Sequence, residues 1–410
     1  MNNKKIIVVG AGPAGIMASI TAAEYSKDIT IIEKNANIGQ KLRITGGGRC
    51  NVTNNSSPDE IMKKVMTNSK FLYKSLHTYT SQQVIKLIED QGCPLKVETE
   101  NKVFPVSDKS SDIIEVFQNL LINRAVKIYY HCEMKDILVK ENKVIGIKTK
   151  DNQDFTCDAI ILATGGVSYQ YTGSTGEALQ ICERLGHSIV PLKPSLISMV
   201  IKEKWLTELT GISLKDIVLK TKIENKSFSF NGDLLFTHYG ISGPTVFELS
   251  AYLNKISLPK EGHRVFIDFL PKVPQEELKE ILITSQKSNK QISSVLTDYL
   301  PKKLSVALLN DINIASDINL SQLNKKDRNR MIDTLKHFPI TVEALRSVKD
   351  AIVTSGGINV KEVNPSTMES KLVKGLYFAG ELLDVDALTG GYNLQIAFST
   401  GYIAGVHSSK

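Results

Sequence analysis

A glycine-rich segment near the start of the chain limits the folds that this sequence can adopt. The segment reads Gly10-Ala11-Gly12-Pro13-Ala14-Gly15, and it lies between a β-branched run at 6–9 and a helix-forming stretch at 13–24. A second apolar run follows at 29–33. Glycines at this G-x-G-x-x-G spacing, after a strand and at the start of a helix, are typical of a dinucleotide-binding βαβ unit. The first glycine permits the tight turn, the second lets the backbone approach a pyrophosphate, and the third lets helix and strand pack closely.

Glu33 ends the second apolar run, 18 residues after Gly15. An acidic side chain at this place can accept hydrogen bonds from a ribose diol, and it disfavours a 2′-phosphate. We therefore expect FAD or NAD, rather than NADP, at this site. The alternative interpretation is a glycine turn followed by an exposed glutamate. We favour the nucleotide site because strand, helix, spacing and acid occur together.

Residues 39–54 read GQKLRITGGGRCNVTN and contain almost no core-forming side chains. Glycines permit close backbone approach to a flat ligand. Arg43 and Arg49 can neutralise phosphate or reduced-flavin charge, and Asn51 can hydrogen-bond a heteroaromatic edge. Cys50 is either a thiol of lowered pKa or a small buried residue, and we favour the second. The segment predicts a ligand-binding loop, with a plain mobile loop as the alternative.

Two further glycine turns follow predicted strands. Ala163-Thr164-Gly165-Gly166 closes one strand, at a place where sheet ends meet ligands in open α/β folds. Near the C-terminus, a strand at 375–379 leads into Gly380-Glu381, and Gly390-Gly391-Tyr392-Asn393 precedes a predicted helix. Because the first and last segments both show an apolar strand, a glycine turn and a following helix, we expect both chain ends to contribute to one sheet.

The chain has 410 residues, which exceeds the size at which a single core usually stops growing. We predict an α/β fold in which 1–190 and 345–410 assemble a discontinuous Rossmann-type FAD-binding domain. An inserted β-rich domain is expected at 191–271, because its short strand-like runs are separated by glycines. A small helical domain is expected at 272–344.

Local patterns also predict where elements begin and end. Ser81 is the expected N-cap of an amphipathic helix that ends near Gly92, and Ser110 or Ser111 is the expected N-cap of another. The short strands at 127–163 predict a meander that returns to the first sheet.

Composition favours an ordinary globular protein, with 42% hydrophobic and 23% charged residues. The formal net charge of +7 mildly favours anionic partners. The basic cluster at 325–330 lacks interleaved aromatic residues, so we interpret it as a solvated face rather than a nucleic-acid site. No apolar run has the length of a membrane span. The five cysteines show neither a C-x-x-C pair nor metal-ligand spacing, so we expect no metal and a reducing cytoplasm.

Seven segments together resemble the BaiN-like family of bacterial NAD(P)/FAD-dependent oxidoreductases, over essentially the whole chain: VVGAGPAG, GQKLRITGGGRCNVTN, KVFPVSDKSSD, LATGG, LLFTHYGISGP, SGGINVKEVNPSTMESK and GLYFAGELLDVDALTGGYNLQIAFSTGYIAG. Members have been assigned as bile-acid enone reductases or aminoacetone oxidases. The resemblance implies non-covalent FAD but no particular substrate. With the motifs above, it assigns cofactor binding to Gly10, Gly12, Pro13, Ala14, Gly15, Glu33, Lys34, Gln40, Lys41, Gly48, Arg49, Cys50, Asn51, Met134 (through its backbone, to adenine), Ala163, Thr164, Gly165, Gly380, Glu381, Gly391, Asn393 and Leu394.

The sequence carries no second G-x-G-x-x-G and no C-x4-C redox pair, so the electron source is open. We expect an FAD-dependent oxidoreductase that transfers hydride between flavin N5 and a small organic substrate, with NAD(P)H as electron donor. One alternative is an amine oxidase that uses oxygen. Alternatives of other classes are an RNA-binding or tRNA-modifying flavoprotein and a non-catalytic FAD protein.

The candidate catalytic residues are His238, Tyr392 and Arg49, with Tyr239 beside His238 in the FTHYG segment. For His238, a satisfied loop histidine is the commoner role. Because both chain ends are used to hold FAD, we expect the insertion at 191–344 to cover the flavin and to set the substrate. We expect a small-molecule substrate, no membrane partner and no nucleic acid, and we leave the oligomeric state open.

Overall fold

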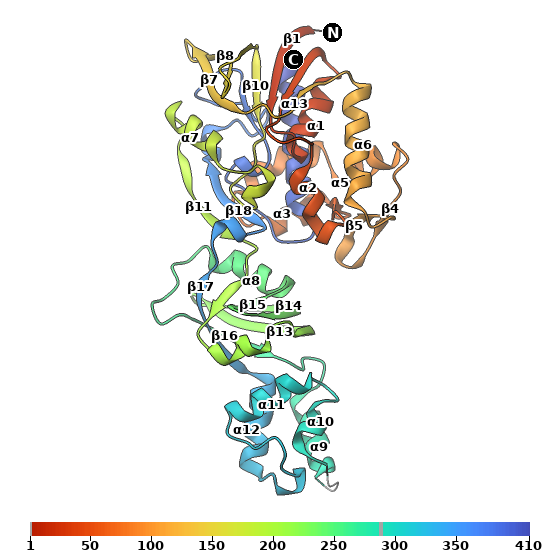
Figure 1. Cartoon of the computed structure of the whole chain (residues 1–410), viewed down its shortest axis with the longest axis vertical. Helices are drawn as coiled ribbons and strands as arrows, with labels where there is room; N and C mark the ends of the chain where they lie inside the picture. Colours follow the sequence, from red (N-terminus) through yellow and green to blue (C-terminus); the bar gives the residue numbers. More distant parts are fainter. Residues whose placement is uncertain (1, 287–289) are drawn as a thin grey trace. The chain divides into compact units, whose positions relative to one another are not determined.

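The computed structural model describes residues 2–286 and 290–410, and the chain divides into two compact units (Figure 1). Unit 1 comprises Met1–Ser195 and Val348–Lys410, and unit 2 comprises Leu196–Ser347. Residues 287–289, within the predicted helical domain, lie outside the described residues. Both chain ends therefore belong to unit 1, and unit 2 is a single insertion.

A five-stranded parallel sheet in the order β19-β10-β1-β2-β6 forms the centre of unit 1. The N-terminal part supplies β1 (Asn2–Val9), β2 (Ser26–Ile32), β6 (Lys127–Tyr129) and β10 (Ala159–Leu162). The C-terminal part supplies β19 (Leu376–Phe378). This sheet confirms the predicted Rossmann-type α/β fold assembled from both chain ends.

The central strands of this sheet are buried, as their continuous apolar runs predict. β1 and β10 pair from Ile6 opposite Ala159 to Val9 opposite Leu162, and every residue of this pairing is buried. Parallel pairing brings the carboxyl ends of the strands to one edge of the sheet. The glycine turns that follow β1, β10 and β19 therefore lie along the same edge.

The first and last long helices pack closely against each other. α1 (Pro13–Ala22) follows β1, and α13 (Tyr392–Ser409) ends the chain. A Cβ at Gly401 of α13 would lie 2.3 Å from the carbonyl oxygen of Ala14 in α1. Only a glycine permits this approach, so the C-terminal helix is built to fit the nucleotide-binding helix.

The remaining elements of unit 1 surround the parallel sheet. β11 (Ile189–Ser195) pairs antiparallel with β18 (Val353–Ile358). Two small antiparallel sheets contain β7 (Met134–Lys140), β8 (Lys143–Thr149) and β9 (Asp154–Thr156), and β3 (Thr53–Asn54), β5 (Lys102–Pro105) and β4 (Leu95–Val97). The helices are α2 (Gln40–Ile44), α3 (Pro58–Lys64), α4 (Tyr73–Thr78), α5 (Ser81–Glu89), α6 (Ser110–Asn123) and α7 (Glu177–Arg184).

Two expectations about helix caps were wrong, and one about strands was right in part. Thr80 is the N-cap of α5, and Ser81 is already its first helical residue. Lys109 holds the N-cap position of α6, because Ser110 donates its hydroxyl to a backbone carbonyl of α2 instead. The meander expected at 127–163 is confirmed in part, because β7, β8 and β9 pair in sequence order and β10 returns to the parallel sheet, whereas β6 pairs with β2 in that sheet.

Unit 2 contains a closed barrel in the order β12-β15-β14-β13-β16-β17. Its strands are β12 (Met199–Ile201), β13 (Ser213–Ile223), β14 (Lys226–Thr237), β15 (Gly240–Ser242), β16 (His263–Asp268) and β17 (Phe338–Leu345). The helices of this unit are α8 (Pro244–Leu253), α9 (Gln275–Ser285), α10 (Ile292–Leu296), α11 (Lys302–Asp311) and α12 (Lys325–Lys336).

One hydrophobic core extends through the barrel and the helices of unit 2. It includes Leu219 of the barrel as well as Leu308 and Ile332 of the helices. The finer division of the insertion into domains at 191–271 and 272–344 stays a prediction.

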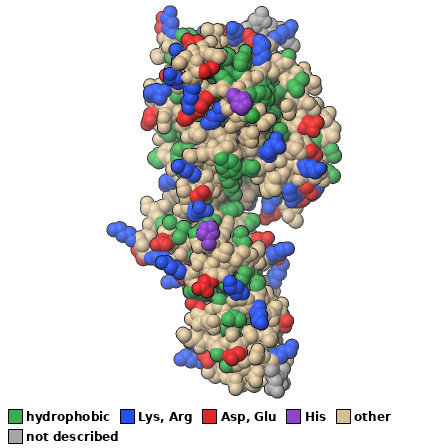
Figure 2. Space-filling model, viewed as in Figure 1, with side chains coloured by type: hydrophobic (Ala, Val, Ile, Leu, Met, Phe, Trp, Pro, Cys, Tyr) green, Lys and Arg blue, Asp and Glu red, His purple; other side chains and the backbone are tan. Residues whose placement is uncertain are grey.

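Charged side chains are mixed on the surface. On the face shown in Figure 2, cationic and anionic groups are interspersed over both units. Within the described part of the chain, none of the helices combines the length and the apolar character needed to cross a membrane. A cytoplasmic location stays a prediction.

Candidate functional site

The first glycine turn is open at one glycine and tightly packed at the other two. A Cβ at Gly12 would meet no atom of the described residues within 4 Å, whereas one at Gly15 would lie 1.9 Å from the Gly10 carbonyl oxygen. A Cβ at Gly10 would lie 2.6 Å from the Ala163 carbonyl oxygen. Gly12 is the N-cap of α1, and Pro13 is its first residue. The unpaired N–H groups of this helix end and the open space beside Gly12 fit a pyrophosphate.

Glu33 is buried directly after β2, and hydrogen bonds fix its carboxylate. The Ala11 N–H donates to Oε2 at 2.7 Å, and the N–H and Nδ2 of Asn35 each donate to Oε1 at 2.7 Å. These bonds use three of the about four acceptor positions of a carboxylate. The remaining position is compatible with a ribose hydroxyl. The neighbouring Lys34 donates from Nζ to Thr175 Oγ1 at 2.8 Å.

The glycine turn at 45–48 and the C-terminal helix meet at Asn51. Gly47 and Gly48 have φ values of 68° and 90°, and a Cβ at either would meet none of the described atoms within 4 Å. Asn51 Oδ1 is buried with no hydrogen-bond partner among residues 2–286 and 290–410. A Cβ at Gly391, the N-cap of α13, would lie 3.0 Å from this oxygen. Because an unpaired buried amide oxygen is costly, we expect a ligand to supply the donor.

Residues at the carboxyl ends of β10 and β19 complete the same edge. Thr164 follows β10, and its Oγ1 is buried without a partner in the described part of the chain. The next residue, Gly165, has a φ of 73°. Gly380 also has a φ of 73°, and a Cβ there would lie 2.8 Å from Ala14 Cβ. Ligands of open α/β folds bind outside the carboxyl ends of the strands, so this edge is the candidate site.

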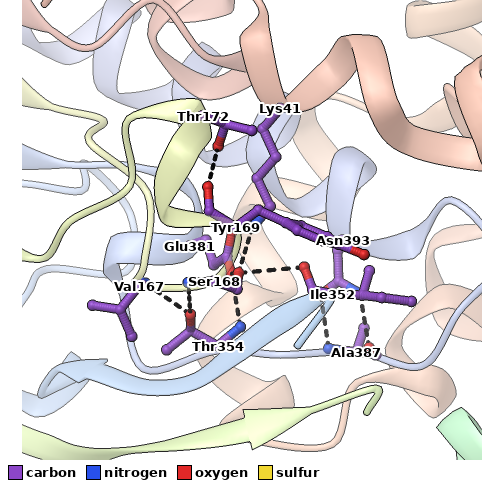
Figure 3. A network of polar contacts seen from close by, with 10 residues as sticks. All are labelled: Lys41, Val167, Ser168, Tyr169, Thr172, Ile352, Thr354, Glu381, Ala387 and Asn393. Atoms are coloured by element: carbon purple, nitrogen blue, oxygen red, sulfur yellow. Dashed lines mark hydrogen bonds and ion pairs between the residues drawn. The ribbon is translucent and has the colours of Figure 1, made fainter. Parts of the chain in front are cut away.

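A polar network holds four segments together at this edge (Figure 3). Lys41 Nζ lies 2.6 Å from Glu381 Oε2 and donates to Ser168 Oγ at 2.7 Å. The Thr354 N–H donates to Glu381 Oε1 at 2.7 Å. The Thr354 hydroxyl oxygen accepts from the N–H groups of Val167 and Ser168. The network therefore fixes α2, the loop after β10, β18 and the short helix η9 (Gly380–Leu382) to one another.

Ser168 and Thr354 were missed by the sequence reasoning. Both side chains are fully buried. Ser168 lies just after the LATGG segment, and Thr354 lies just before the SGG segment, so their positions beside these motifs were a usable signal. Their contact joins residues 186 positions apart, and no local pattern encodes such a pairing.

The other predicted cofactor residues take simpler positions. Gln40 begins α2, Met134 is buried at the start of β7, and Leu394 is half-buried in the first turn of α13. The Asn393 side chain accepts from the Ala387 N–H at 3.0 Å and donates to the Ala387 carbonyl at 2.8 Å. Asn393 thus shapes the loop before its own helix (Figure 3).

Arg49 lies among acidic side chains. Its Nε is 2.8 Å from Asp108 Oδ1, and it also pairs with Glu98. Its guanidinium carbon lies 4.1 Å from the centroid of the Phe104 ring. Hydrogen bonds with Glu98 and Asp108 raise the pKa of Arg49. Because two carboxylates already balance its charge, this geometry lends no support to a charge-neutralising role of Arg49 at the flavin, and that role stays a prediction.

Cys50 is fully buried, and its N–H donates to the Thr45 carbonyl at 2.9 Å. Burial raises the pKa of the Cys50 thiol to about 12. A thiolate nucleophile is therefore not available near neutral pH. The geometry supports the small buried role rather than the reactive thiol.

The two remaining catalytic candidates occupy different units. Tyr392 is buried at the first position of α13 in unit 1, and its ring packs against Gly390, where a Cβ would lie 2.8 Å from ring Cε2. His238 is exposed in the two-residue turn between β14 and β15 in unit 2. Its ring packs edge-on against Tyr239, with the centroids 4.7 Å apart. Catalytic roles for both residues stay predictions.

Tyr239 is held by its neighbours in the barrel. The guanidinium carbon of Arg346 lies 4.3 Å from the centroid of the Tyr239 ring. Burial opposes ionisation of this phenol, but hydrogen bonds with Ser198 and Arg346 outweigh it and lower the pKa of Tyr239. Tyr239 is therefore a better acid than an ordinary tyrosine, which suits a proton donor.

Within residues 2–286 and 290–410, no group of three or more His, Cys, Asp and Glu side chains is arranged to hold a metal ion. The observations at the sheet edge point to an organic ligand instead. Open space beside Gly12 and the unpaired oxygens of Asn51 and Thr164 fit a dinucleotide that extends from the pyrophosphate turn to the C-terminal helix.

Comparison with known proteins gives matches over the full length. A family model described as "HI0933-like protein Rossmann domain" matches residues 4–407. The chain is 34% identical over 410 residues to a ribosomal RNA dihydrouridine synthase of Haemophilus influenzae, with 98% of each chain covered. It is 30% identical over 405 residues to a 3-dehydro-bile acid delta(4,6)-reductase of Clostridium scindens, again with 98% of each chain covered. These matches confirm the resemblance to BaiN-like flavoproteins.

Solved structures share the fold. A flavocytochrome c3 fumarate reductase matches with a TM-score of 0.54 at 16% identity, over 99% of this chain and 78% of that chain. A 3-ketosteroid-delta4-(5alpha)-dehydrogenase from Rhodococcus jostii RHA1 matches with a TM-score of 0.53 at 13% identity, over 99% and 97%. At these identities the likeness concerns the fold alone.

Proposed function

The chain belongs to the HI0933-like Rossmann family, and from this premise we propose that it reduces a carbon–carbon double bond conjugated to a carbonyl group, with uridine in ribosomal RNA as the substrate. The observation that carries the proposal is full-length similarity to relatives named for two different substrates. A uracil ring and a bile-acid enone share one reactive element, a double bond conjugated to a carbonyl. The reaction class is therefore what the two relatives have in common.

The protein is an FAD-dependent oxidoreductase. FAD, when bound, supplies a two-electron carrier whose N5 accepts or donates hydride. We assign the pyrophosphate to the turn at Gly12 and the ribose to Glu33. We assign polar contacts with the cofactor to Asn51 and Thr164, since their oxygens are buried without partners in the described part of the chain.

RNA takes precedence over a small molecule for three reasons. The relative at 34% identity is a ribosomal RNA enzyme, and an Escherichia coli protein of the same name is 29% identical over 412 residues. The net charge of +7 also favours a polyanion. The sequence alone favours a small-molecule substrate over nucleic acid, because no aromatic residues accompany the basic cluster at 325–330.

Reduction of uridine adds two electrons and two protons, formally one hydride and one proton, across the double bond. We keep NAD(P)H as the proposed electron donor. We propose that the insertion sets the substrate and that the turn between β14 and β15 supplies the proton, because it carries two acid–base side chains, His238 and Tyr239, and holds Tyr239 against Arg346. The lowered pKa of Tyr239 is consistent with this role. In this scheme, His238→Ala retains FAD but changes turnover.

The function is tested in a single turnover without oxygen. The FAD-loaded protein is first reduced with NADH or NADPH, and bleaching of the flavin identifies the donor. Ribosomal RNA is then added, the RNA is digested, and the nucleosides are analysed by mass spectrometry. We expect dihydrouridine in amounts stoichiometric with the reduced enzyme, and none with the Gly12→Val variant.

The other candidates give different results in the same assay. If a steroid enone reoxidises the reduced flavin and no dihydrouridine forms in the RNA, the substrate is a small molecule, as the name of the Clostridium scindens relative indicates for that protein. Bleaching by an amine, with peroxide formed in air, would identify an oxidase. Either result would overturn the proposed RNA substrate while leaving the FAD assignment in place.

A further inference from the structure

The outside of the barrel carries an exposed aromatic ring in the middle of a four-strand face. Strand register aligns Ser229, Lys220, Phe266 and Pro339 in one row across β14, β13, β16 and β17. Phe266 is 38% exposed, although its neighbours in β16 on both sides are fully buried. Alternate residues of a strand face opposite sides, so this row lies on the outer face of the barrel.

A second row continues the same face with cationic side chains. Lys222 lies opposite Ser227, and Arg264 lies opposite Thr341. Lys222 and Arg264 are each two residues from a member of the first row, and both are exposed. Cations therefore lie beside the exposed ring on two neighbouring strands.

The charges on this face are largely free to meet a partner. Lys220 Nζ lies 3.3 Å from Asp268 Oδ2 and is partly neutralised. Lys222 and Arg264 form no ion pair among the described residues. The exposed acids nearest in sequence are Glu224, in the turn between β13 and β14, and Glu261, three residues before Arg264. Glu343 is also exposed and lies on the neighbouring strand β17.

Unit 2 also carries more than its share of the positive charge. Its sequence has 21 lysines and arginines against 17 aspartates and glutamates, a net charge of +4 out of +7 for the whole chain. This unit holds well under half of the residues. Charge complementarity therefore favours a polyanion over a neutral or basic partner. The exposed ring of Phe266 favours RNA among polyanions, because a base can stack on it.

We propose that this face, the barrel platform (Lys220, Lys222, Ser227, Ser229, Arg264 and Phe266), binds an unpaired segment of the RNA substrate. A base stacks on the exposed ring of Phe266, and the cations meet the flanking phosphates. Unpaired RNA is favoured over a duplex because only unstacked bases can lie on an aromatic side chain. The inference rests on the proposed function in taking RNA as the substrate, and it adds the surface that holds this RNA.

Binding is measured with the full-length, FAD-loaded protein and a fluorescent single-stranded oligouridylate of about 12 nucleotides, a length within the range for such binding surfaces. Stacking of one base is worth about 1–3 kcal/mol, so Phe266→Ala should weaken binding about 5- to 150-fold. Phe266→Trp should bind as tightly as the wild type, because it keeps an aromatic ring at this position. The double variant Lys222→Gln/Arg264→Gln should lower the salt-dependence slope by about 0.7 for each charge removed.

The matched control removes two charges elsewhere. Lys325→Gln/Lys326→Gln, on α12, makes the same change in charge outside the barrel platform and should leave affinity and slope within twofold of the wild type. Circular dichroism and melting confirm that each variant is folded. The proposal is overturned if Phe266→Ala binds as the wild type does, if the control weakens binding more than the platform variants, or if duplex RNA binds as tightly as the single strand.

Product analysis separates this proposal from the proposed function. If oligouridylate binding depends on the barrel platform but ribosomal RNA yields no dihydrouridine, the proposed function fails and the binding surface is retained. If dihydrouridine forms at the wild-type rate and with the wild-type RNA requirement in the platform variants, the surface fails and the proposed function is retained.

Discussion

Gly12 and Gly15 lie three residues apart in one turn, but a side chain would meet different surroundings at each. At Gly12 a Cβ finds open space within the described structure, whereas at Gly15 it would lie 1.9 Å from a backbone oxygen. Gly12 also has an ordinary φ of −79°. The chain itself therefore tolerates a side chain at Gly12, and only a bound pyrophosphate would exclude it.

We predict that Gly12→Val folds but does not retain FAD. Its urea midpoint should stay close to that of the wild-type protein stripped of flavin, and its flavin stoichiometry should fall at least tenfold. Gly15→Ala serves as the contrasting variant and should fail to fold, because the backbone cannot clear its Cβ. A soluble Gly12→Val protein with full flavin content would show that this glycine does not face the cofactor.

His187 is a buried side chain that the proposed chemistry does not use. Its Nδ1 lies 3.2 Å from Glu362 Oε2, its Nε2 lies 2.9 Å from Ser370 Oγ, and its ring packs edge-on against Phe378. Burial lowers the pKa of His187, and the contact with Glu362 only partly offsets this effect. The folded protein therefore binds a proton at His187 less readily than the unfolded chain does.

This shift predicts a loss of stability in mild acid. A histidine whose pKa is lowered by folding leaves stability unchanged above its unfolded pKa of about 6.5 and reduces it as the pH falls below that value. The free energy of unfolding in urea should thus decrease from pH 7.5 to pH 5.5, and His187→Gln should reduce this decrease. An equal decrease in both proteins would locate the acid sensitivity at other groups.

At the scale of elements, local patterns predicted the first strand, its helix and the second strand because each carries its own signal. The run at 6–9, the glycine turn and Glu33 are all encoded within one short segment. Helix caps were less predictable, since Thr80 and Ser81 are both good capping residues and only the backbone decides between them. Strand partners were the least predictable, because β6 and β10 pair with strands that are distant in the sequence.

The network in Figure 3 makes a prediction about how the elements at the sheet edge depend on one another. Lys41 and Glu381 are each 20% exposed, so removal of one partner leaves a charge partly buried. Glu381→Gln should destabilise the protein by about 1–3 kcal/mol and weaken FAD binding. Lys41→Met should have a similar effect, and the double variant should cost less than the sum of the two single variants.

The measurement is a double-mutant cycle in urea, with flavin fluorescence as a second readout. Strictly additive effects would mean that Lys41 and Glu381 act independently. In that case the network would not fix α2 to η9.

At the scale of the whole molecule, the sequence predicted that both chain ends form one nucleotide-binding fold around an insertion. The segments at 10–15 and 375–381 each place a glycine turn after an apolar strand. The parallel sheet joins these strands through β1, β10 and β19. The candidate site was predictable where the role of a residue follows from its amino-acid type and its local motif, as for Gly12. It was not predictable where the role depends on distant partners, as with the acids around Arg49.

The central claim is that this fold holds FAD, and the most direct measurement is identification of the released chromophore. The purified protein is denatured, and the supernatant is chromatographed against FAD, FMN and nicotinamide dinucleotides. We predict one FAD for each chain, released without covalent attachment, because the pyrophosphate turn and Glu33 specify a dinucleotide. Release of FMN, of a nicotinamide dinucleotide alone, or of no flavin from protein reconstituted with FAD would contradict the account.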